Sequence, residues 1–149
     1  MRSSNDAATV ERVLDANALV VLALDQRRAV AIEKLLRTWK AEGEELHAPV
    51  LLRYEIASAL AQAVAAGQLE PEAVVDATQR IDSVPIVLHQ PKDTPAVVAM
   101  TQRLERRSAY DAAYVVLAEE LDTQLWTLDG RLARNAVSRG LPVQIIQTD

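Results

Sequence analysis

Short apolar runs alternate along this chain with longer segments in which apolar residues recur every three or four positions. A short apolar run bounded by turn residues is typical of a buried strand, and the second pattern is typical of an amphipathic helix. We expect strands at 12–15, 45–48, 85–89, 124–127 and 143–146. We expect helices at 17–25, 29–41, 49–66, 70–82, 94–107, 108–120 and 129–139.

Proline, glycine and hydroxyl residues indicate where several of these helices begin or end. Pro49 is expected at the start of the long third helix, and Gly67 just after its end. Thr94 is a candidate N-cap for the helix at 94–107, and Ser108 is a candidate N-cap for the helix that follows.

Strands separated by helices predict an α/β fold, with a central, mostly parallel sheet of five strands flanked by helices. The chain has 149 residues and half of them are hydrophobic, which suits one domain with a sizeable core. We expect this domain at 11–149, after a flexible polar leader at 1–10. In such sheets, ligands bind beyond the carboxyl ends of the strands.

Four carboxylates interrupt the apolar pattern. Asp15 and Asn17 are the only polar residues in the run VLDANALVVLAL. Glu55 lies in an apolar helix, Asp111 lies in SAYDAAYVVLAEEL, and Asp129 directly follows QLWTL. A buried, unpaired carboxylate is costly or becomes protonated, whereas a divalent cation would supply the missing positive charge. We therefore treat the four acids as candidate metal ligands.

The residue types that are available narrow the identity of this cation. The chain has no cysteine, which excludes disulfides, thiolate zinc sites and a cysteine nucleophile. It has two histidines, His47 and His89, and we interpret both as structural rather than catalytic. Four carboxylates with no other ligands therefore indicate Mg²⁺ or Mn²⁺, together with phosphate chemistry.

Each acid also has a structural alternative. Asp15 and Asp129 could cap the helices that follow them. Asp111 falls in the first turn of a helix, where the helix dipole favours an acid. Glu55 could belong to a polar stripe that faces solvent, with the serine and the glutamine three and seven residues further on.

The formal charge of −5 argues against a protein that coats DNA, although it leaves a nuclease possible once metal neutralises the four acids. Arginines flank two of these acids: three precede Asp111 and three follow Asp129. Arg107 and Arg131 are our candidate phosphate contacts, with a solvated helix face as the alternative. Aromatic residues are scarce, which argues against a base-stacking platform of the OB or RRM kind.

The order and surroundings of these residues resemble the PIN domain and, within it, the VapC-type toxin ribonucleases of toxin–antitoxin pairs. The resemblance covers 12–146. It rests on four segments: VLDANALV with Asp15 and Asn17, LLRYEIASAL with Glu55, SAYDAAYVVLAEEL with Asp111, and LWTLDGRLA with Thr127 and Asp129.

This resemblance implies a parallel five-stranded sheet and a Mg²⁺- or Mn²⁺-dependent endoribonuclease. It also implies a homodimer that a small cognate antitoxin inhibits. Asp15, Glu55, Asp111 and Asp129 would form the acidic metal site, with Asn17 and Thr127 as polar support. The polar leader and the asparagine at 17, where a serine is frequent, depart from the family pattern and leave substrate preference open.

Other classes of protein share parts of the pattern. A haloacid-type phosphatase needs a second aspartate where this chain has Asn17, and a phospho-receiver needs an acidic pair and a late lysine that the pattern lacks. A non-catalytic protein-binding module remains an alternative, although it has no reason to keep four costly acids. No apolar run reaches the length of a membrane span, and we expect a cytoplasmic protein.

Overall fold

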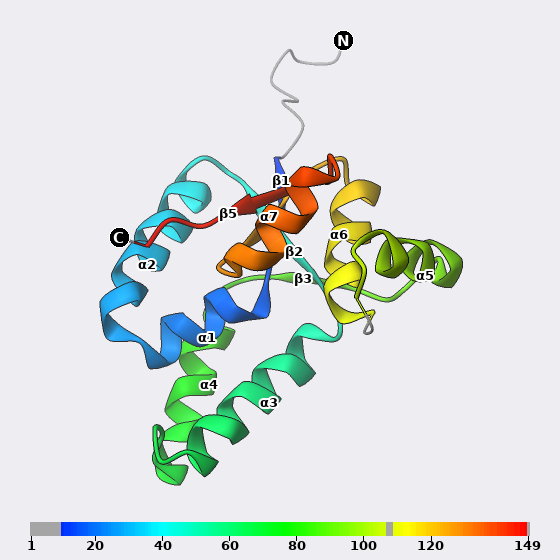
Figure 1. The fold of residues 1–149 in the computed structure, drawn as a ribbon. Helices are drawn as coiled ribbons and strands as arrows, with labels where there is room; N and C mark the ends of the chain where they lie inside the picture. Colours follow the sequence, from blue (N-terminus) through cyan, green and yellow to red (C-terminus); the bar gives the residue numbers. More distant parts are fainter. Residues whose placement is uncertain (1–9, 107–108, 149) are drawn as a thin grey trace.

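Five parallel strands form the centre of the molecule, in the order β3-β2-β1-β4-β5 (Figure 1). The computed structural model describes residues 10–106 and 109–148. The strands are β1 (Glu11–Leu14), β2 (Glu45–Pro49), β3 (Val87–His89), β4 (Leu125–Thr127) and β5 (Val143–Ile145). Every pair of neighbouring strands is parallel, which confirms the predicted α/β fold.

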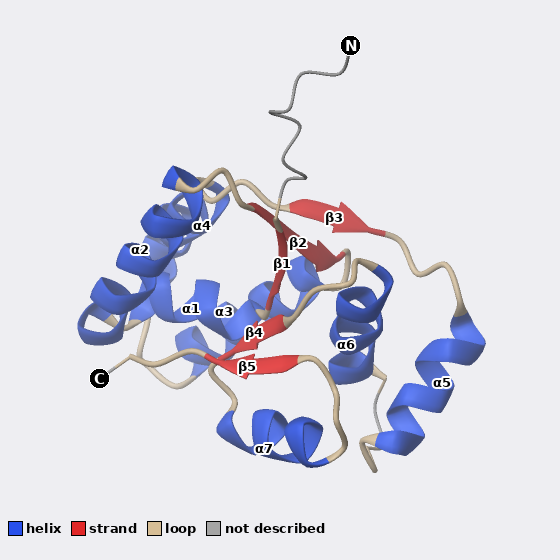
Figure 2. Cartoon of the chain, turned by 90° about the horizontal axis from the view of Figure 1, so that it is seen from above, coloured by secondary structure: helices blue, strands red, loops and turns tan. Residues whose placement is uncertain are grey.

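Helices cover both faces of this sheet, so the molecule has three layers (Figure 2). The helical elements are α1 (Ala16–Leu24), α2 (Gln26–Ala41), α3 (Leu52–Ala65), the 3₁₀ turn η1 (Pro71–Ala73), α4 (Val74–Asp82), α5 (Thr94–Arg103), α6 (Tyr110–Glu120) and α7 (Gly130–Ser138). On one face, α1 packs against α2, α3 and α4. On the other face, α6 packs against β1, β2 and β4 and carries α5 on its outside, while α7 lies along β5.

The central strand β1 is anchored on both faces. Val13 and Leu14 are fully or almost fully buried, as expected of a strand with helices on either side. Near the start of β1, the Arg12 guanidinium lies 4.7 Å from the centre of the Trp39 ring and 4.9 Å from that of Trp126. Trp39 belongs to α2 and Trp126 to β4, so this cation–π contact ties a helix to two neighbouring strands.

The predicted elements are all present, but several boundaries were wrong. Pro49 ends β2 instead of opening α3, which begins at Leu52. A proline lacks an N–H, and the next residue, Val50, donates the bond to the His89 carbonyl instead, at 2.9 Å. The helix expected at 70–82 is divided into η1 and α4, the strand expected at 85–89 is limited to β3, and the strand expected at 143–146 ends one residue earlier.

Two further corrections concern helix starts. α2 begins three residues earlier than predicted, because Asp25 accepts a hydrogen bond from the Arg28 N–H at 3.1 Å and caps the new helix. The N-cap of α5 is Asp93 rather than Thr94, since the Asp93 carboxylate accepts from the Ala96 N–H at 3.0 Å. The predicted cap Ser108 lies outside the described residues, and α5 ends at Arg103.

The connections of the sheet create a switch point beside β1. After β1 the chain builds β2 and β3 on one side, then returns to build β4 and β5 on the other side. The helices that follow β1 and β4 therefore leave the sheet on opposite faces, and a crevice opens between the carboxyl ends of these strands. None of the helices at 10–106 and 109–148 combines the length and the hydropathy that a membrane span requires.

Candidate active site

Asp15 and Thr127 meet at this switch point. Leu14 is in register with Trp126, so the next residue of each chain segment emerges at the same edge of the sheet. The Thr127 hydroxyl donates a hydrogen bond to Asp15 Oδ2 at 2.7 Å. Thr127 is completely buried and Asp15 is 8% exposed. Asp15 stands at the N-cap position of α1 without a capping hydrogen bond of normal geometry. The backbone N–H groups of Ala16 and Asn17 nevertheless interact with its carboxylate and lower its pKa, against the effect of burial.

Asp129 is connected to the same threonine but also has a structural role. Its backbone N–H donates to Thr127 Oγ1 at 3.0 Å, which fixes the turn after β4. Its Oδ1 atom accepts from the Leu132 N–H at 3.0 Å and caps α7, as the structural alternative predicts. Capping uses one oxygen of this half-exposed carboxylate, so metal binding by the other oxygen is compatible with it.

Glu55 reaches the site from α3 and is held there by α6. The buried Tyr114 hydroxyl donates to Glu55 Oε1 at 2.6 Å. Tyr114 lies three residues after Asp111, so the two side chains lie on the same face of α6. One helix thus supplies a candidate metal ligand and the residue that orients another. The sequence reasoning missed Tyr114, although its spacing from Asp111 in SAYDAAY could have indicated it.

Burial raises the pKa of Asp15 above its ordinary value, and the hydrogen bond from Thr127 opposes this rise. The negative charge of Asp111 raises the pKa of Asp15 further. Burial likewise raises the pKa of Glu55, against the hydrogen bond from Tyr114, and the charges of Asp15 and Asp111 add to the rise. These carboxylates therefore influence one another across elements far apart in the sequence.

Asp111 and Asp129 complete the coupled group. Burial raises the pKa of Asp111, the Arg106 guanidinium lowers it, and the charge of Asp129 raises it. Arg106 Nε lies 3.8 Å from Asp111 Oδ2, which is long for an ion pair. Among the described residues, no other ion pair joins a basic side chain to any of the four acids. Arg106 is therefore the one ion-pair partner of these carboxylates in the described part of the chain.

This donor set fits a hard divalent cation. In the described part of the chain, no three of the four carboxylates have oxygen atoms that all lie within 4.8 Å of one another. Mg²⁺ does not need such a cage, because it keeps several water molecules and is usually held through one or two carboxylates. A buried carboxylate at a water-accessible edge, with further acids beside it, matches this kind of binding.

A groove beside Glu55 runs along α3. It encloses about 500 Å³ and is lined by Asn17, Leu51, Tyr54, Glu55, Ser58, Ala59, Gln62 and Tyr110. The polar stripe that contains Glu55 therefore lines an open groove. Asn17 is exposed and lines this groove.

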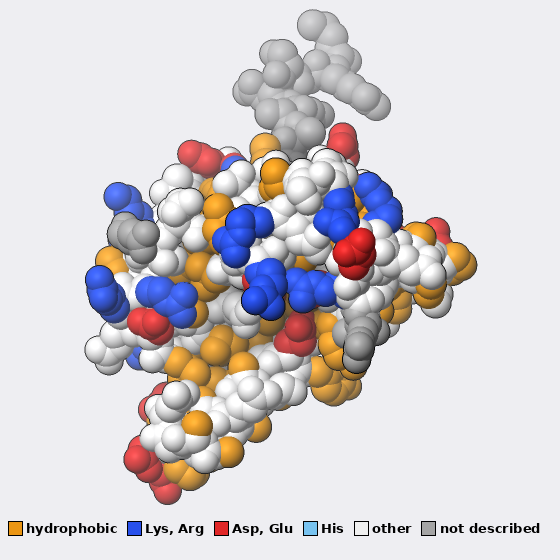
Figure 3. Space-filling model, viewed as in Figure 1, with side chains coloured by type: hydrophobic (Ala, Val, Ile, Leu, Met, Phe, Trp, Pro, Cys, Tyr) orange, Lys and Arg blue, Asp and Glu red, His pale blue; other side chains and the backbone are white. Residues whose placement is uncertain are grey.

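Basic side chains gather on the face that carries α7, with acidic side chains beside them (Figure 3). Arg131 is exposed in the first turn of α7, close in sequence to Asp129. Arg139 instead bonds Asn135 and pairs with Glu105 at 3.2 Å, so its role is structural. The other candidate phosphate contact, Arg107, lies outside the described residues.

The PIN domain family matches residues 12–138, a range that contains all four acids and both supporting residues. The chain belongs to the PIN-domain family. This PIN domain is also similar to ribonucleases from Mycobacterium tuberculosis. It is 36% identical to ribonuclease VapC1 over 137 residues, which are 91% of this chain and 96% of that protein.

Two more ribonucleases of the same organism are about as similar to this PIN domain. Ribonuclease VapC3 is 34% identical over 136 residues, covering 90% of this chain and 93% of the relative. Ribonuclease VapC12 is 33% identical over 123 residues, covering 83% and 90%. The crystal structure of PAE2754 from Pyrobaculum aerophilum has the same fold, with a TM-score of 0.65 and 24% identity over 85% of this chain and 79% of that one.

Proposed function

We propose that this PIN domain is the metal-dependent endoribonuclease toxin of a VapBC-type toxin–antitoxin pair. The observation that carries the proposal is the coupled group of carboxylates around Asp15, in which burial and mutual repulsion raise the pKa of three members. Such a group destabilises the fold unless a cation is bound, so it is expected where metal binding is needed. The similarity to relatives named as ribonucleases supports RNA as the substrate.

Asp15, Glu55, Asp111 and Asp129 would hold the cation, which we propose to be Mg²⁺ or Mn²⁺. Such an ion activates water near neutral pH and neutralises the negative charge that develops on the phosphate in hydrolysis. Whether one ion or two bind, the hard oxygen donors favour these metals over Zn²⁺ at this edge.

The neighbouring side chains keep these carboxylates in position. Thr127 fixes one oxygen of Asp15, and its own oxygen is fixed by the Asp129 N–H. Burial, together with the Glu55 carboxylate, raises the pKa of the Tyr114 hydroxyl, so the phenol stays protonated and remains a donor to Glu55. Preorganised carboxylates of this kind need not rearrange during the reaction, which is the main advantage that an enzyme has over water.

We further propose that the groove beside Glu55 receives single-stranded RNA. Tyr54 is 78% exposed and Tyr110 is 63% exposed, and both line this groove. Exposed aromatic rings stack on unpaired bases irrespective of sequence. Asn17 can donate to a phosphate or a sugar hydroxyl, and Arg131 and Arg107 are proposed to contact phosphates. The groove would therefore lead the RNA to the acids.

The proposed toxin role implies a small antitoxin that blocks this edge, and a homodimer as the form that acts. Exposed apolar side chains such as Val98 and Val137 are available for packing between subunits. A chain without cysteine that acts on RNA is proposed to work in the cytoplasm. Sedimentation at micromolar concentration tests the dimer, and a sharp monomer peak would contradict it.

A cleavage assay on a structured RNA tests the proposal. We expect no cleavage in excess EDTA, and recovery when Mg²⁺ or Mn²⁺ is added beyond the chelator. Full cleavage in EDTA would exclude metal dependence. A folded protein that binds RNA with either ion but never cuts it would point to a non-catalytic module.

A further inference from the structure

A second group of potential ligands lies at the opposite, amino-terminal edge of the sheet. Glu11 begins β1 and Glu45 begins β2, and the two are direct partners in the parallel ladder. His47 follows Glu45 by two residues, so all three side chains point to the same face of the sheet. One carboxylate oxygen from each glutamate and one His47 nitrogen all lie within 4.8 Å of one another.

The His47 ring is buried and its Nε2 atom is directed at the two carboxylates. His47 is only 4% exposed. Nε2 lies 2.8 Å from Glu45 Oε1 and 3.8 Å from Glu11 Oε1. Within the described residues it has no hydrogen-bond partner, since the Glu11 oxygen is too distant and the contact with Glu45 lacks hydrogen-bond geometry. A short distance without hydrogen-bond geometry is unusual for a histidine–carboxylate pair, but it is normal for two ligands of one ion.

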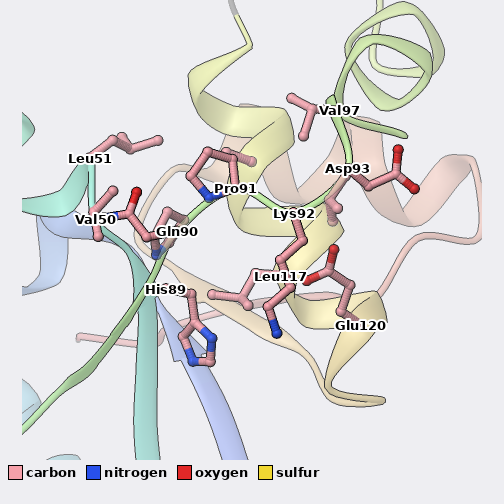
Figure 4. Close-up of a pocket in the computed structure, with 13 residues that line it drawn as sticks. Val50, Leu51, His89, Gln90, Pro91, Lys92, Asp93, Val97, Leu117 and Glu120 are labelled. Atoms are coloured by element: carbon pink, nitrogen blue, oxygen red, sulfur yellow. The ribbon is translucent and has the colours of Figure 1, made fainter. Parts of the chain in front are cut away.

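The other ring nitrogen of His47 is engaged by His89. His47 Nδ1 lies 2.7 Å from His89 Nε2, so one of the two nitrogens donates to the other. His89 is the last residue of β3. It also lines a small, mainly apolar pocket of about 140 Å³, together with the segment that leads from β3 to α5 (Figure 4). If His47 Nδ1 carries the hydrogen, Nε2 is left with a free lone pair beside two carboxylates, as in histidines that bind metals and are oriented by a second partner.

We propose that Glu11, Glu45 and His47 form a second divalent metal site, for an ion of the Zn²⁺ class, with water completing the coordination. Ligand atoms about 2.1 Å from one ion lie about 3.0 Å apart at a right angle and about 3.4 Å apart at a tetrahedral angle. The two distances from His47 Nε2, 2.8 and 3.8 Å, lie on either side of these values. An imidazole ligand favours Zn²⁺, Ni²⁺ or Co²⁺ over Mg²⁺, in contrast to the all-oxygen group at the other edge.

A metal at this position would clamp the amino ends of β1 and β2. Both glutamates are on the rim of the sheet, with side chains 34% and 49% exposed, so solvent reaches the ligands. His47 is buried in the middle of β2, so the sheet holds this ligand in a fixed position. The inference does not depend on RNA cleavage, because the residues and the edge of the sheet are different.

Zinc binding to the full chain carrying Asp15→Asn and Asp111→Asn tests this proposal, since these changes disable the acidic edge. We expect one zinc ion per chain by equilibrium dialysis and elemental analysis. Adding Glu45→Gln or Glu11→Gln should weaken binding by at least tenfold, whereas the exposed Glu33→Gln should leave it unchanged. Circular dichroism checks that each variant is folded.

A second readout avoids the glutamate substitutions. In the chain that carries only Asp15→Asn and Asp111→Asn, zinc should move the ¹⁵N resonance of His47 Nε2 to the range of a metal-bound imidazole nitrogen. The proposal would be overturned if the chain with Asp15→Asn and Asp111→Asn bound no zinc. It would also be overturned if adding Glu11→Gln or Glu45→Gln left the zinc affinity unchanged. A protonated His47 that zinc does not alter would instead show a plain ion pair with Glu45.

Discussion

The two ends of β1 carry charged residues in opposite electrostatic settings. Near its start, Arg12 binds the Glu44 carboxylate through two of its nitrogens, with the Nη2–Oε1 bond at 2.9 Å. The hydrogen bond from Arg12 holds the pKa of Glu44 below its usual range. Because the ionised form of Glu44 is preferred in the folded protein, this carboxylate stabilises the fold at neutral pH.

Just after the end of β1, Asp15 lies among other acids, and the pKa shifts have the opposite sign. Burial raises the pKa of Asp15, Glu55 and Asp111, and one arginine at 3.8 Å is the ion-pair partner of the group among the described residues. Ionisation of these acids therefore costs stability at neutral pH. A carboxylate beside an arginine thus supports the fold, whereas carboxylates beside one another indicate a site that needs a cation.

The largest expected difference between the two ends is in catalysis. Asp15→Asn or Asp111→Asn should lower the rate of RNA cleavage by about 10²–10³-fold or more, because each removes charge from the group that stabilises the transition state. The double variant should be scarcely slower than either single one, since the acids act as a unit. Initial rates in Mg²⁺ measure this, with Asp76→Asn on the exposed face of α4 as the control. Full activity in both single variants would end the nuclease assignment.

The second largest expected effect is a loss of stability, and it concerns the amino-terminal end of β1. Arg12→Ala should lower the free energy of unfolding by about 2–3 kcal/mol, because it leaves the Glu44 carboxylate unpaired and removes the contact with the two tryptophans. Urea denaturation measures the loss, and the folded variant should cleave RNA at the normal rate. Arg28→Ala, which breaks an exposed pair with Asp25, is the control and should change stability far less. An equal loss in both variants would contradict the structural role of Arg12.

A smaller effect is expected when a side chain that lines the groove beside Glu55 is removed, and it concerns the affinity for RNA. Tyr54→Ala should weaken binding of single-stranded RNA by about tenfold, since stacking of one base on an aromatic ring contributes about 1–3 kcal/mol. Tyr54→Phe keeps the ring and should bind normally. Fluorescence anisotropy in EDTA measures binding without cleavage. Unchanged affinity of the alanine variant would place the RNA elsewhere.

The smallest expected effect is a pH-dependent gain in stability. The folded protein raises the pKa of Asp111, so this acid lowers stability as the pH rises from its ordinary value of 3.8 through the value in the folded state. In EDTA, Asp111→Asn should therefore melt at a higher temperature than the unaltered protein at pH 7. The gain should vanish on acidification below about 3.8. A variant that is less stable at pH 7 would show that Asp111 is a structural acid held by Arg106.

Much of the fold could be predicted from the chain, because its strands are short apolar runs buried between helices. The helix and strand boundaries that were predicted wrongly depend on tertiary contacts, which the hydrophobic pattern does not reveal. Asp25 ends one helix and caps the next, so two helices meet without the predicted gap. Pro49 has no N–H and suits either the start of a helix or the end of a strand, and the ladder with β3 decides between them.

The acids of the candidate site could be found because carboxylates are conspicuous in apolar segments. Their partners could not, since Tyr114 looks like an ordinary core aromatic until α3 brings Glu55 to its hydroxyl. The second group of ligands depends on strand register alone, because only the pairing of Glu11 with Glu45 places both beside His47.

Isothermal titration calorimetry with Mg²⁺ tests the central claim most directly, because this ion binds oxygen ligands and avoids imidazole. The unaltered protein and Arg12→Ala should bind Mg²⁺ with the same affinity. Asp15→Asn and Asp111→Asn should lose measurable binding while remaining folded. Equal Mg²⁺ affinity in all four proteins would contradict the account, because it would show that the acidic edge of the sheet is not the metal site.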